Sequence, residues 1–307
     1  GINLQWNTTS YFESPFVVED NKEIAKHFFS LEEGVIDAVN KRILPRVMEL
    51  NEQYKNNFRA IKGVFINRPE IDMCVEQLKQ DKSMIIHGKA GQGKSGCTQG
   101  VIRYCEEQDI PYIAIKLDDR IPEQNAEKWG EELGLTTSIP MALSMICENE
   151  KGVIILDQLD ALRWTQIHSR QALIICEEVI KRVEEINLNR NKKISIIFVC
   201  RTYDYENDSS IKALFHKVDN PQNKERESLC WEEVIVKELA EEIVRRIVGP
   251  RYDRLSCKMK KVLSIPSNLY IWEHLEQDSV YDEYSTANQL IQKWWEQIKQ
   301  KCKMNQL

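Results

Sequence analysis

A short apolar run leads directly into a glycine-rich loop in the stretch Met84-Ile85-Ile86-His87-Gly88-Lys89-Ala90-Gly91-Gln92-Gly93-Lys94-Ser95. Residues 88–95 match the pattern G-x-x-x-x-G-K-[ST]. Glycine lets the backbone turn so tightly that successive N–H groups can point at a single anion. The stretch therefore predicts a phosphate-binding loop between a strand and a helix.

The individual positions of this loop, a P-loop, have separate chemical roles. Lys94 supplies positive charge for the outer phosphates of a nucleotide, and the Ser95 hydroxyl can ligate Mg²⁺. The helix expected over residues 95–106 directs the positive end of its dipole at the same anion. The alternative is a glycine turn that binds nothing. The residues expected to contact nucleotide here are Gly88, Ala90, Gly91, Gln92, Gly93, Lys94, Ser95 and Gly96.

Further apolar runs predict the rest of a parallel sheet. Besides residues 84–87, the runs are 112–117, 152–156 and 194–200, with 233–236 as a candidate fifth strand. A segment with strong helical spacing, residues 169–186, separates two of these runs. Continuous apolar strands alternating with helices are typical of a parallel sheet covered on both faces. The fold class we predict is therefore α/β, a P-loop nucleotide-triphosphatase sheet flanked by helices.

Asp157 closes one of the apolar runs, Val153-Ile154-Ile155-Leu156. A carboxylate at that strand end can contact Mg²⁺ directly or through water. The pattern alone is weak, but it lies about sixty residues after a P-loop, which makes it specific. The run at residues 112–117 intervenes between the two motifs, as in the additional-strand, AAA+-like division of P-loop proteins.

The residues around Asp157 predict the chemistry at the outer phosphate. Gln158 stands where many ATPases of that division carry a water-activating Glu, and Asp160 is the next carboxylate, a candidate to orient the water. Arg201 follows the run 194–200 and is a candidate catalytic contact of the γ-phosphate; the alternative is a pair with a surface carboxylate. Arg170, at the start of a helix, could reach a neighbouring subunit's nucleotide or simply lie on the helix surface.

Helical segments flank the predicted sheet on both sides. Residues 23–50 carry apolar positions at three- and four-residue spacing. After Leu239 the pattern is helical again, with breaks at Gly249-Pro250 and Ile265-Pro266. The division we expect is a helical lead-in or arm over 1–60, a nucleotide-binding domain over 61–237 and a small helical domain over 238–307.

Composition excludes several classes of protein. The 307 residues have a net charge of −6, so the chain as a whole lacks the electrostatic footprint of a nucleic-acid-binding protein. A basic cluster within residues 245–261 is more simply a solvated helix face. No apolar run is long enough to span a bilayer, and no signal peptide is present. Nine cysteines without a CxxC pair argue for a reducing, cytoplasmic compartment and against a zinc site.

Taken in order, these features resemble the STAND class of signal-transduction ATPases, which includes the NACHT and apoptotic or resistance-protein ATPases and the bacterial anti-phage Avs-type proteins. The resemblance covers roughly residues 60–275. It is carried by Phe65-Ile66-Asn67-Arg68-Pro69-Glu70, the P-loop, the D-x-x-D of Asp157 and Asp160, Arg201, and Ser264-Ile265-Pro266-Ser267-Asn268-Leu269. The resemblance implies that Ile66, Asn67 and Arg68 line an adenine pocket, that Pro266 packs on adenine and that Arg201 senses the γ-phosphate.

The same resemblance implies a function. It is that of a regulatory ATPase core that binds ATP or ADP with Mg²⁺, hydrolyses ATP slowly, and switches conformation and homo-oligomerisation, with a role in anti-phage defence. The alternatives are an AAA+-like motor or loader acting on nucleic acid, and an assembly scaffold that binds nucleotide without catalysis. STAND proteins normally begin with an effector domain and continue into a sensor array, so we expect an excised core of a larger protein, with Gly1 a cloning remnant.

Overall fold

A computed structural model describes residues 39–163, 169–215, 229–275 and 284–304. The arm predicted before residue 39 lies outside the described residues, as does the first part of the helix predicted over residues 23–50. That helix is described from Val39 on, first as a short π-helix, η1 (Val39–Ile43), and then as α3 (Leu44–Asn56).

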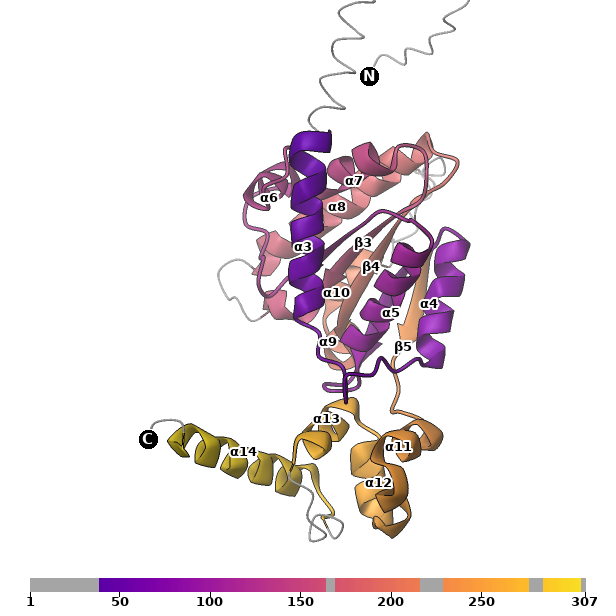
Figure 1. Ribbon diagram of the computed structural model, residues 1–307. Helices are drawn as coiled ribbons and strands as arrows, with labels where there is room; N and C mark the ends of the chain where they lie inside the picture. The colour runs from indigo at the N-terminus through magenta and orange to yellow at the C-terminus, as the bar shows by residue number, and fades with distance from the viewer. Residues whose placement is uncertain (1–38, 164–168, 216–228, 276–283, 305–307) are drawn as a thin grey trace, which may run out of the picture.

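A five-stranded parallel sheet forms the centre of the molecule, with strand order β2-β3-β4-β1-β5 (Figure 1). The strands are β1 (Ser83–Gly88), β2 (Tyr112–Lys116), β3 (Gly152–Asp157), β4 (Ile194–Arg201) and β5 (Trp231–Ile235). The predicted α/β fold and the candidate fifth strand are thus confirmed. Since β4 lies between β1 and β3, the strand that carries Asp157 is not the neighbour of the P-loop strand. This strand order is that of the additional-strand, AAA+-like division of P-loop proteins.

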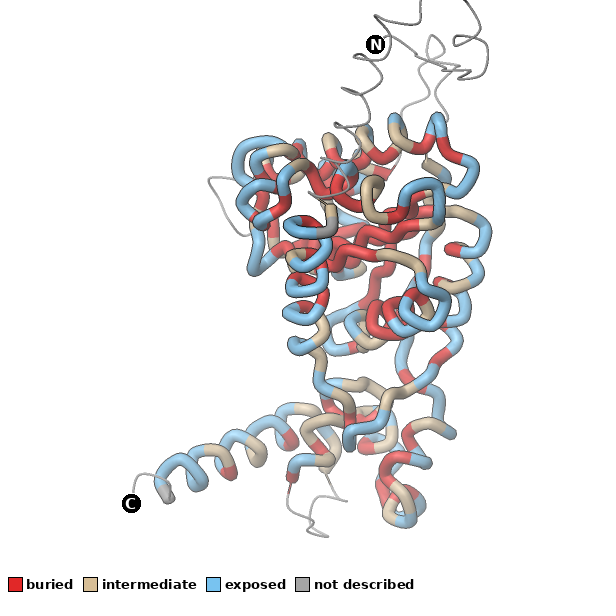
Figure 2. The backbone as a smooth tube through the Cα atoms, turned by 45° about the horizontal axis from the view of Figure 1, so that its top comes forward, coloured by how far each residue is buried: buried red, intermediate tan, exposed pale blue. Residues whose placement is uncertain are grey.

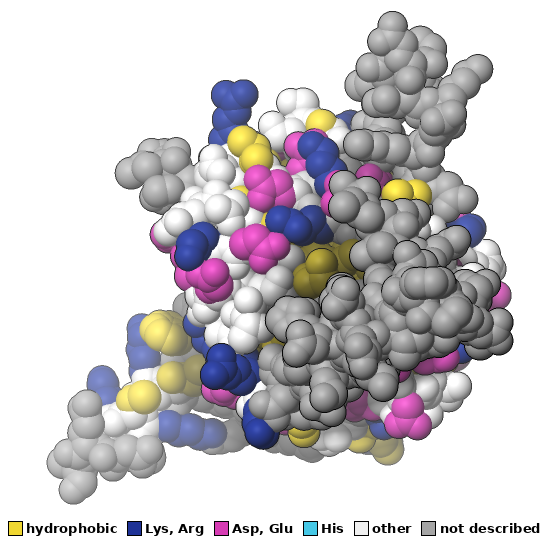
Figure 3. Space-filling view, turned by 90° about the horizontal axis from the view of Figure 1, so that it is seen from above, with side chains coloured by type: hydrophobic (Ala, Val, Ile, Leu, Met, Phe, Trp, Pro, Cys, Tyr) yellow, Lys and Arg dark blue, Asp and Glu magenta, His cyan; other side chains and the backbone are white. Residues whose placement is uncertain are grey.

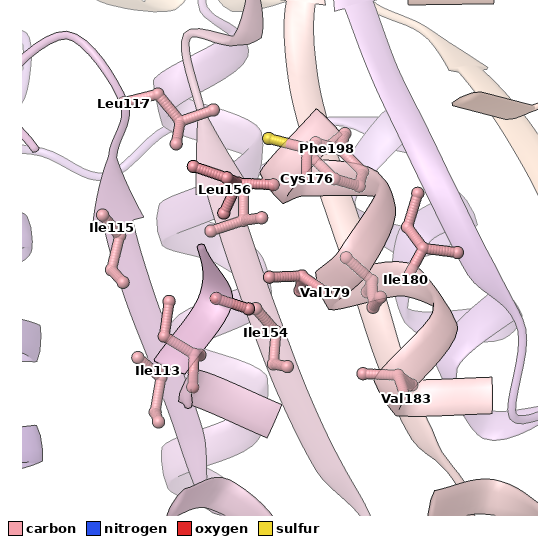
Figure 4. Close-up of a cluster of buried hydrophobic side chains, with 14 of the residues drawn as sticks. Ile113, Ile115, Leu117, Ile154, Leu156, Cys176, Val179, Ile180, Val183 and Phe198 are labelled. Carbon is pink, nitrogen blue, oxygen red and sulfur yellow. The ribbon is translucent and has the colours of Figure 1, made fainter. Parts of the chain in front are cut away.

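Strands β1 to β4 are buried on both faces, which explains their apolar runs, whereas the edge strand β5 is mostly half-buried or exposed. Successive side chains point to opposite faces of a strand, so Ile154 and Leu156 of β3 pack on one face, while Val153 and Ile155 pack on the other. Figure 4 shows the first face, where side chains of β2, β3 and β4 meet Val179 of helix α8.

The helices form a layer on each face. Helices α4 (Pro69–Lys79) and α5 (Lys94–Glu107) cover one face. The other face is covered by α6 (Ala126–Glu132), α7 (Ile139–Cys147), η2 (Leu159–Arg163), α8 (Ser169–Leu188), α9 (Thr202–Asn207) and α10 (Ser209–Phe215). The tube in Figure 2 is red through the sheet and through the inner sides of both layers, so the core lies between them.

Helix α3 closes the edge of the sheet along β2 (Figure 1). The Asn51 side chain donates to Tyr112 O at 2.8 Å and accepts from Ala114 N at 2.9 Å. It therefore satisfies two backbone groups that an edge strand would otherwise leave unpaired. Val47 and Tyr54 of the same helix enter the cores on opposite faces of the sheet.

A second helical group, α11–α14, lies beyond the carboxyl ends of the strands (Figure 1). Its elements are α11 (Glu241–Val248), η3 (Gly249–Arg254), α12 (Cys257–Leu263), α13 (Pro266–His274) and α14 (Ala287–Met304). They share a small core of their own, around Met259, Leu269 and Trp272. At the opposite end of the molecule, basic and acidic side chains are interspersed on the visible described surface (Figure 3). Within the described residues, no helix is long and apolar enough to cross a membrane.

Candidate functional site

A cavity of about 670 Å³ opens at the carboxyl ends of the strands, between the P-loop, the end of α3 and the helices α11–α14. This is the edge of an open parallel sheet at which ligands usually bind. The predicted residues that line it are Ile66, Arg68, Ala90, Gly91, Gly93, Lys94, Ser95, Gly96, Asp157, Asp160, Arg201 and Pro266. Asn67, Gly88 and Gln92 do not line the cavity, and Arg170 is exposed on α8, outside it.

The P-loop has the backbone that its glycines predict. Gly91 and Gly93 have φ angles of 77° and 88°, in the left-handed region that favours glycine. At Gly88 a side chain would place its Cβ 2.8 Å from Val236 O, so the loop also needs glycine for close packing. Gly93 ends the turn as the N-cap of α5, which aims the amino end of that helix at the cavity.

Lys94 is the cation of the loop. Its Nζ donates to Gly88 O at 2.9 Å and to Lys89 O at 3.2 Å, so the ammonium group is held across the loop. Burial lowers the pKa of Lys94, against the opposing charges of Asp160 and Asp157. A desolvated ammonium group of this kind gains most from an anionic partner, so the cradle fits a phosphate chain.

Asp157 is buried at the end of β3, where it borders the cavity. Its Oδ1 accepts from Gln158 N at 2.8 Å, and its Oδ2 accepts from the Tyr54 hydroxyl at 2.9 Å. Burial raises the pKa of Asp157, and these two hydrogen bonds act in the opposite direction. Burial and the charge of Asp157 also raise the pKa of Tyr54 well above its usual value, so the Tyr54 hydroxyl keeps its proton.

The donor set fits Mg²⁺ bound together with phosphates. The described residues contain no group of three or more His, Cys, Asp or Glu side chains that could hold a metal by themselves. Mg²⁺ commonly uses one or two protein oxygens and takes its other ligands from water and phosphates. Ser95 at the start of α5 and Asp157 at the end of β3 line the same cavity and can supply those oxygens.

Asp160 and Arg201 form one unit. Asp160 Oδ2 lies 3.0 Å from Arg201 Nε, and Asp160 Oδ1 accepts from Arg201 N at 3.1 Å. Asp160 is buried, whereas the side chain of Arg201 is half exposed. Arg201 therefore pairs with a buried carboxylate of the site rather than with a surface carboxylate. Because Arg201 engages both of its oxygens, Asp160 is placed to position this cation, and its water-orienting role stays a prediction.

Gln158 occupies a special backbone position beside this pair. Its φ of 64° is unusual for a residue other than glycine, and its side chain borders the cavity. The amide orientation that satisfies both of its neighbours has the nitrogen donating to Asp118 Oδ2 at 2.7 Å and the oxygen accepting from Lys116 Nζ at 3.2 Å. Lys116 ends β2 and lines the same cavity. No sequence pattern marks Lys116 as a site residue, because a lysine at the end of an apolar run is common.

Arg68 stabilises the P-loop through hydrogen bonds of its guanidinium group. It is buried, its Nε and Nη2 bond to the Glu70 carboxylate at 2.9 and 2.8 Å, and its Nη1 donates to Gln92 O at 2.8 Å. Nη2 also donates to Lys237 O, just after β5. The guanidinium group thus holds the loop and the end of β5, and Arg68 also lines the cavity, where a contact with adenine stays a prediction. Asn67 accepts from Arg68 N.

The helices α11–α14 contact the P-loop directly through the start of α13. Ser267 N donates to Gly91 O at 3.1 Å, and Pro266 Cγ lies 3.2 Å from the place where a Cβ on Gly93 would be. Pro266 therefore packs against the loop itself.

Apolar and aromatic side chains line the cavity together with the charged groups, which suits a flat organic base joined to phosphates. They are Phe58, Ile61, Val64, Leu239, Tyr270, Ile271 and Trp294. These residues, like Tyr54, come from segments far apart in the sequence, so no local pattern marks them.

Sequence comparisons with known proteins find no relative, and structure comparisons find distant similarities. No family model matches the sequence, and no curated protein matches it. Among solved structures, the chain is similar to a Walker-type ATPase of Pyrococcus abyssi, with a TM-score of 0.46 and 13% identity over 80% of this chain and 75% of that one. It is also similar to the ORC1 protein of Aeropyrum pernix in complex with DNA, with a TM-score of 0.39 and 12% identity over 74% and 66% of the two chains.

A third similar structure is DnaA of Aquifex aeolicus bound to AMPPCP, with a TM-score of 0.39 and 13% identity over 68% of this chain and 63% of that one. The chain thus spans about two thirds to three quarters of these proteins. Such distant similarities carry no argument about activity. The P-loop ATPase fold is assigned on the strand order and the loop of this chain.

Proposed function

We propose that this chain is a regulatory ATPase core that binds ATP or ADP with Mg²⁺ and converts the state of the nucleotide into a movement of α11–α14. The observation that carries the proposal is the contact between the start of α13 and the P-loop, where Ser267 N donates to Gly91 O. A helical group that touches the phosphate-binding loop can respond to what the loop holds.

The binding step follows from the positions of the charged groups. Lys94 exchanges its two carbonyl partners for phosphate oxygens, and the N–H groups of the loop and of the first turn of α5 donate to the same anion. Ser95 and Asp157 hold Mg²⁺, which neutralises phosphate charge and orients the phosphate chain. The base would lie against apolar side chains of the cavity, such as Phe58 just after α3 and Tyr270 and Ile271 of α13.

Slow hydrolysis follows from the residue beside Asp157. Gln158 can orient a water molecule by hydrogen bonds, but its amide cannot accept a proton as a carboxylate does. Arg201, held by Asp160, is placed to stabilise charge on the outer phosphate. An enzyme that lacks a strong general base and retains an electrostatic clamp suits a switch with a long-lived ATP state.

The switch itself is a difference in contacts between two nucleotide states. ATP and ADP differ at the γ-phosphate, which Arg201 and Lys94 would contact in the cavity that α13 also lines. A ligand shifts a conformational equilibrium only through such differential contacts. We propose that the ATP state releases α11–α14 from the loop and promotes homo-oligomerisation.

The proposal also covers the protein class to which the chain belongs and its division into domains. It places the chain in the STAND class, with a nucleotide-binding domain over residues 61–237 and a helical domain over residues 238–307. A role in anti-phage defence rests on that resemblance alone.

The test is a comparison of particle shape and mass in the two nucleotide states. Small-angle scattering and light scattering are measured with Mg·ADP and with a non-hydrolysable Mg·ATP analogue. We expect the analogue to give a more open or larger particle, and Arg201→Ala to bind the analogue without this change. Arg182→Ala is the matched control, because Arg182 pairs with Glu127 at 3.0 Å on the distant α8. Identical scattering in both nucleotide states would contradict the switch.

A motor or loader acting on nucleic acid is the second candidate. The observation in its favour is the set of exposed basic side chains on α11, η3 and α12, namely Arg245, Arg246, Arg254, Lys258 and Lys261. Arg245 is partly neutralised by Asp253 at 2.7 Å. This candidate requires salt-dependent binding of DNA together with DNA-stimulated ATP turnover. The absence of both would remove it.

A further inference from the structure

Helix α3 reaches the proposed metal site through a single hydroxyl group. Tyr54 is buried, and its Oη lies 2.9 Å from Asp157 Oδ2 and 2.9 Å from Thr98 Oγ1. Thr98 in turn donates to Ser95 O at 3.0 Å. One tyrosine thus connects the carboxylate at the end of β3 with the first turn of α5, the two segments that would supply protein ligands to Mg²⁺.

The hydroxyl group has one proton to give. A phenol donates one hydrogen bond, and an ionised carboxylate is a stronger acceptor than a neutral hydroxyl. Thr98 already directs its own proton to Ser95 O. The proton of Tyr54 therefore goes to Asp157, where it fixes the plane of the carboxylate and leaves the second lone pair of Oδ2 for a metal ligand or its water.

Tyr54 is itself held in place by the sheet. One turn earlier on α3, Asn51 bonds to Tyr112 O and Ala114 N of β2 at 2.8 and 2.9 Å. These two bonds fix the height of the helix along the edge strand. A displacement of α3 would withdraw the Tyr54 hydroxyl from Asp157.

We propose that Tyr54 is a positioning residue for Asp157 that sets the affinity for Mg²⁺, and that α3 is thereby coupled to the metal site. The inference rests on the proposed function, because it requires Mg²⁺ to bind with a nucleotide at Asp157 and Ser95. Groups that orient a metal ligand commonly change metal affinity tenfold to a hundredfold when they are removed.

The experiment compares Tyr54→Phe with the wild type by titrating Mg²⁺ against a fluorescent ATP analogue, and by measuring Mn²⁺ binding by electron paramagnetic resonance in the presence of the analogue. We expect about a tenfold or greater loss of Mg²⁺ and Mn²⁺ affinity. Binding of the analogue in EDTA should stay within about twofold of wild type, because the hydroxyl contacts no phosphate group in the proposal. Thermal unfolding verifies that the variant is folded.

Two control variants separate positioning from packing. Tyr112→Phe removes another phenol hydroxyl that bonds to a carboxylate, Glu106 Oε1 at 2.8 Å, but Tyr112 does not line the cavity. Thr98→Val removes the other polar atom beside the Tyr54 hydroxyl and keeps Asp157 as the acceptor of its proton. Both should keep the Mg²⁺ affinity within about threefold of the wild type.

The outcomes are distinct. Wild-type Mg²⁺ affinity in Tyr54→Phe would overturn the inference, as would an equal loss in Thr98→Val, which would show that the site responds only to packing. Failure of the proposed function is seen separately, as wild-type protein that binds no ATP analogue with or without Mg²⁺.

Discussion

At the scale of single residues, the buried carboxylate Asp157 combines a functional role with a cost in stability. It is buried, and among the described residues its carboxylate accepts from two donors, Gln158 N and the Tyr54 hydroxyl. Burial raises its pKa, so the folded protein binds a proton there more readily than the unfolded chain does. The stabilising contribution of such a group is fully present below its unfolded pKa and is lost as the pH rises through its folded pKa.

Asp157→Asn should therefore stabilise the nucleotide-free protein at neutral pH. An Asn amide can accept from Gln158 N and donate to Tyr54, whose own proton then goes to Thr98. We expect a gain of about 1 kcal/mol, or roughly 2–4 °C in melting temperature. Thermal unfolding is measured without Mg²⁺ or nucleotide. The gain should be larger at pH 8 than at pH 5, and a variant less stable than wild type at pH 8 would refute the prediction.

Asp160 gives a second prediction at this scale. Asp160→Asn keeps the size of the side chain but removes the charge that holds Arg201 Nε at 3.0 Å. We expect ATP turnover to fall about tenfold to a hundredfold, with the Kd for Mg·ATP within about threefold of wild type. Asp109→Asn, at an exposed turn with φ of 51°, is the control and should leave both values unchanged. An equal loss of ATP binding and turnover would contradict a role confined to Arg201.

Some residues of the site are marked by a local sequence motif, and others reach it only through tertiary packing. The P-loop and Asp157 are marked by local patterns, so their place at the carboxyl edge could be predicted. Tyr54 and Trp294 enter the cavity from helices that are distant along the chain, and only the packing of those helices brings them there. For Arg68 and Asp160, the sequence predicts participation in the site, whereas the ion pairs that restrict their roles depend on tertiary contacts.

At the scale of elements, α3 lies along the edge strand β2, in the place where a sixth strand could pair. Asn51 supplies one donor and one acceptor to the backbone of the strand, as a neighbouring strand would. The apolar periodicity predicts this helix correctly as far as it is described, but periodicity does not specify which sheet edge a helix covers. Strands β1 to β4 were predictable because each contains an apolar run that is buried on both faces, whereas the edge strand β5 has only Val234 buried and was predictable only as a candidate.

Asn51→Ala should show how much this edge contact contributes to stability. The substitution leaves Tyr112 O and Ala114 N without their partner in a buried place. We expect a loss of about 2–3 kcal/mol in the free energy of unfolding, measured by urea denaturation. Asn56→Ala, at an exposed position of the same helix, should change it by less than about 0.5 kcal/mol. Equal effects of the two substitutions would remove the special role of Asn51.

At the scale of the whole molecule, two packed bodies are in contact at the P-loop. The sheet with its helix layers forms one body, and α11–α14 have a separate small core. Their contact near the nucleotide site includes the hydrogen bond from Ser267 N to Gly91 O and the packing of Pro266 on Gly93. Residues of both bodies therefore line the site, so we expect a movement of one body to alter the site.

Gly91→Ala should separate the two bodies, because the added Cβ would lie 2.3 Å from Ser267 Oγ. Small-angle scattering of the nucleotide-free variant should give a larger radius of gyration than wild type. The double variant Gly91→Ala/Ser267→Gly keeps the strain of a φ of 77° but removes this clash, so it should return to the wild-type value. If the single and double variants scatter alike, the contact does not hold the bodies together.

The most direct test of a nucleotide switch is to denature the purified protein and identify the nucleotide it releases, beside Lys94→Ala and Lys89→Ala. Lys94 is the partly buried cation of the loop, whereas Lys89 is exposed in the same loop and serves as the matched control. We predict about one ADP per chain from the wild type and from Lys89→Ala, and none from Lys94→Ala. A wild type that is empty and turns over ATP rapidly would contradict the switch, and a Lys94→Ala variant that retains its nucleotide would contradict the site itself.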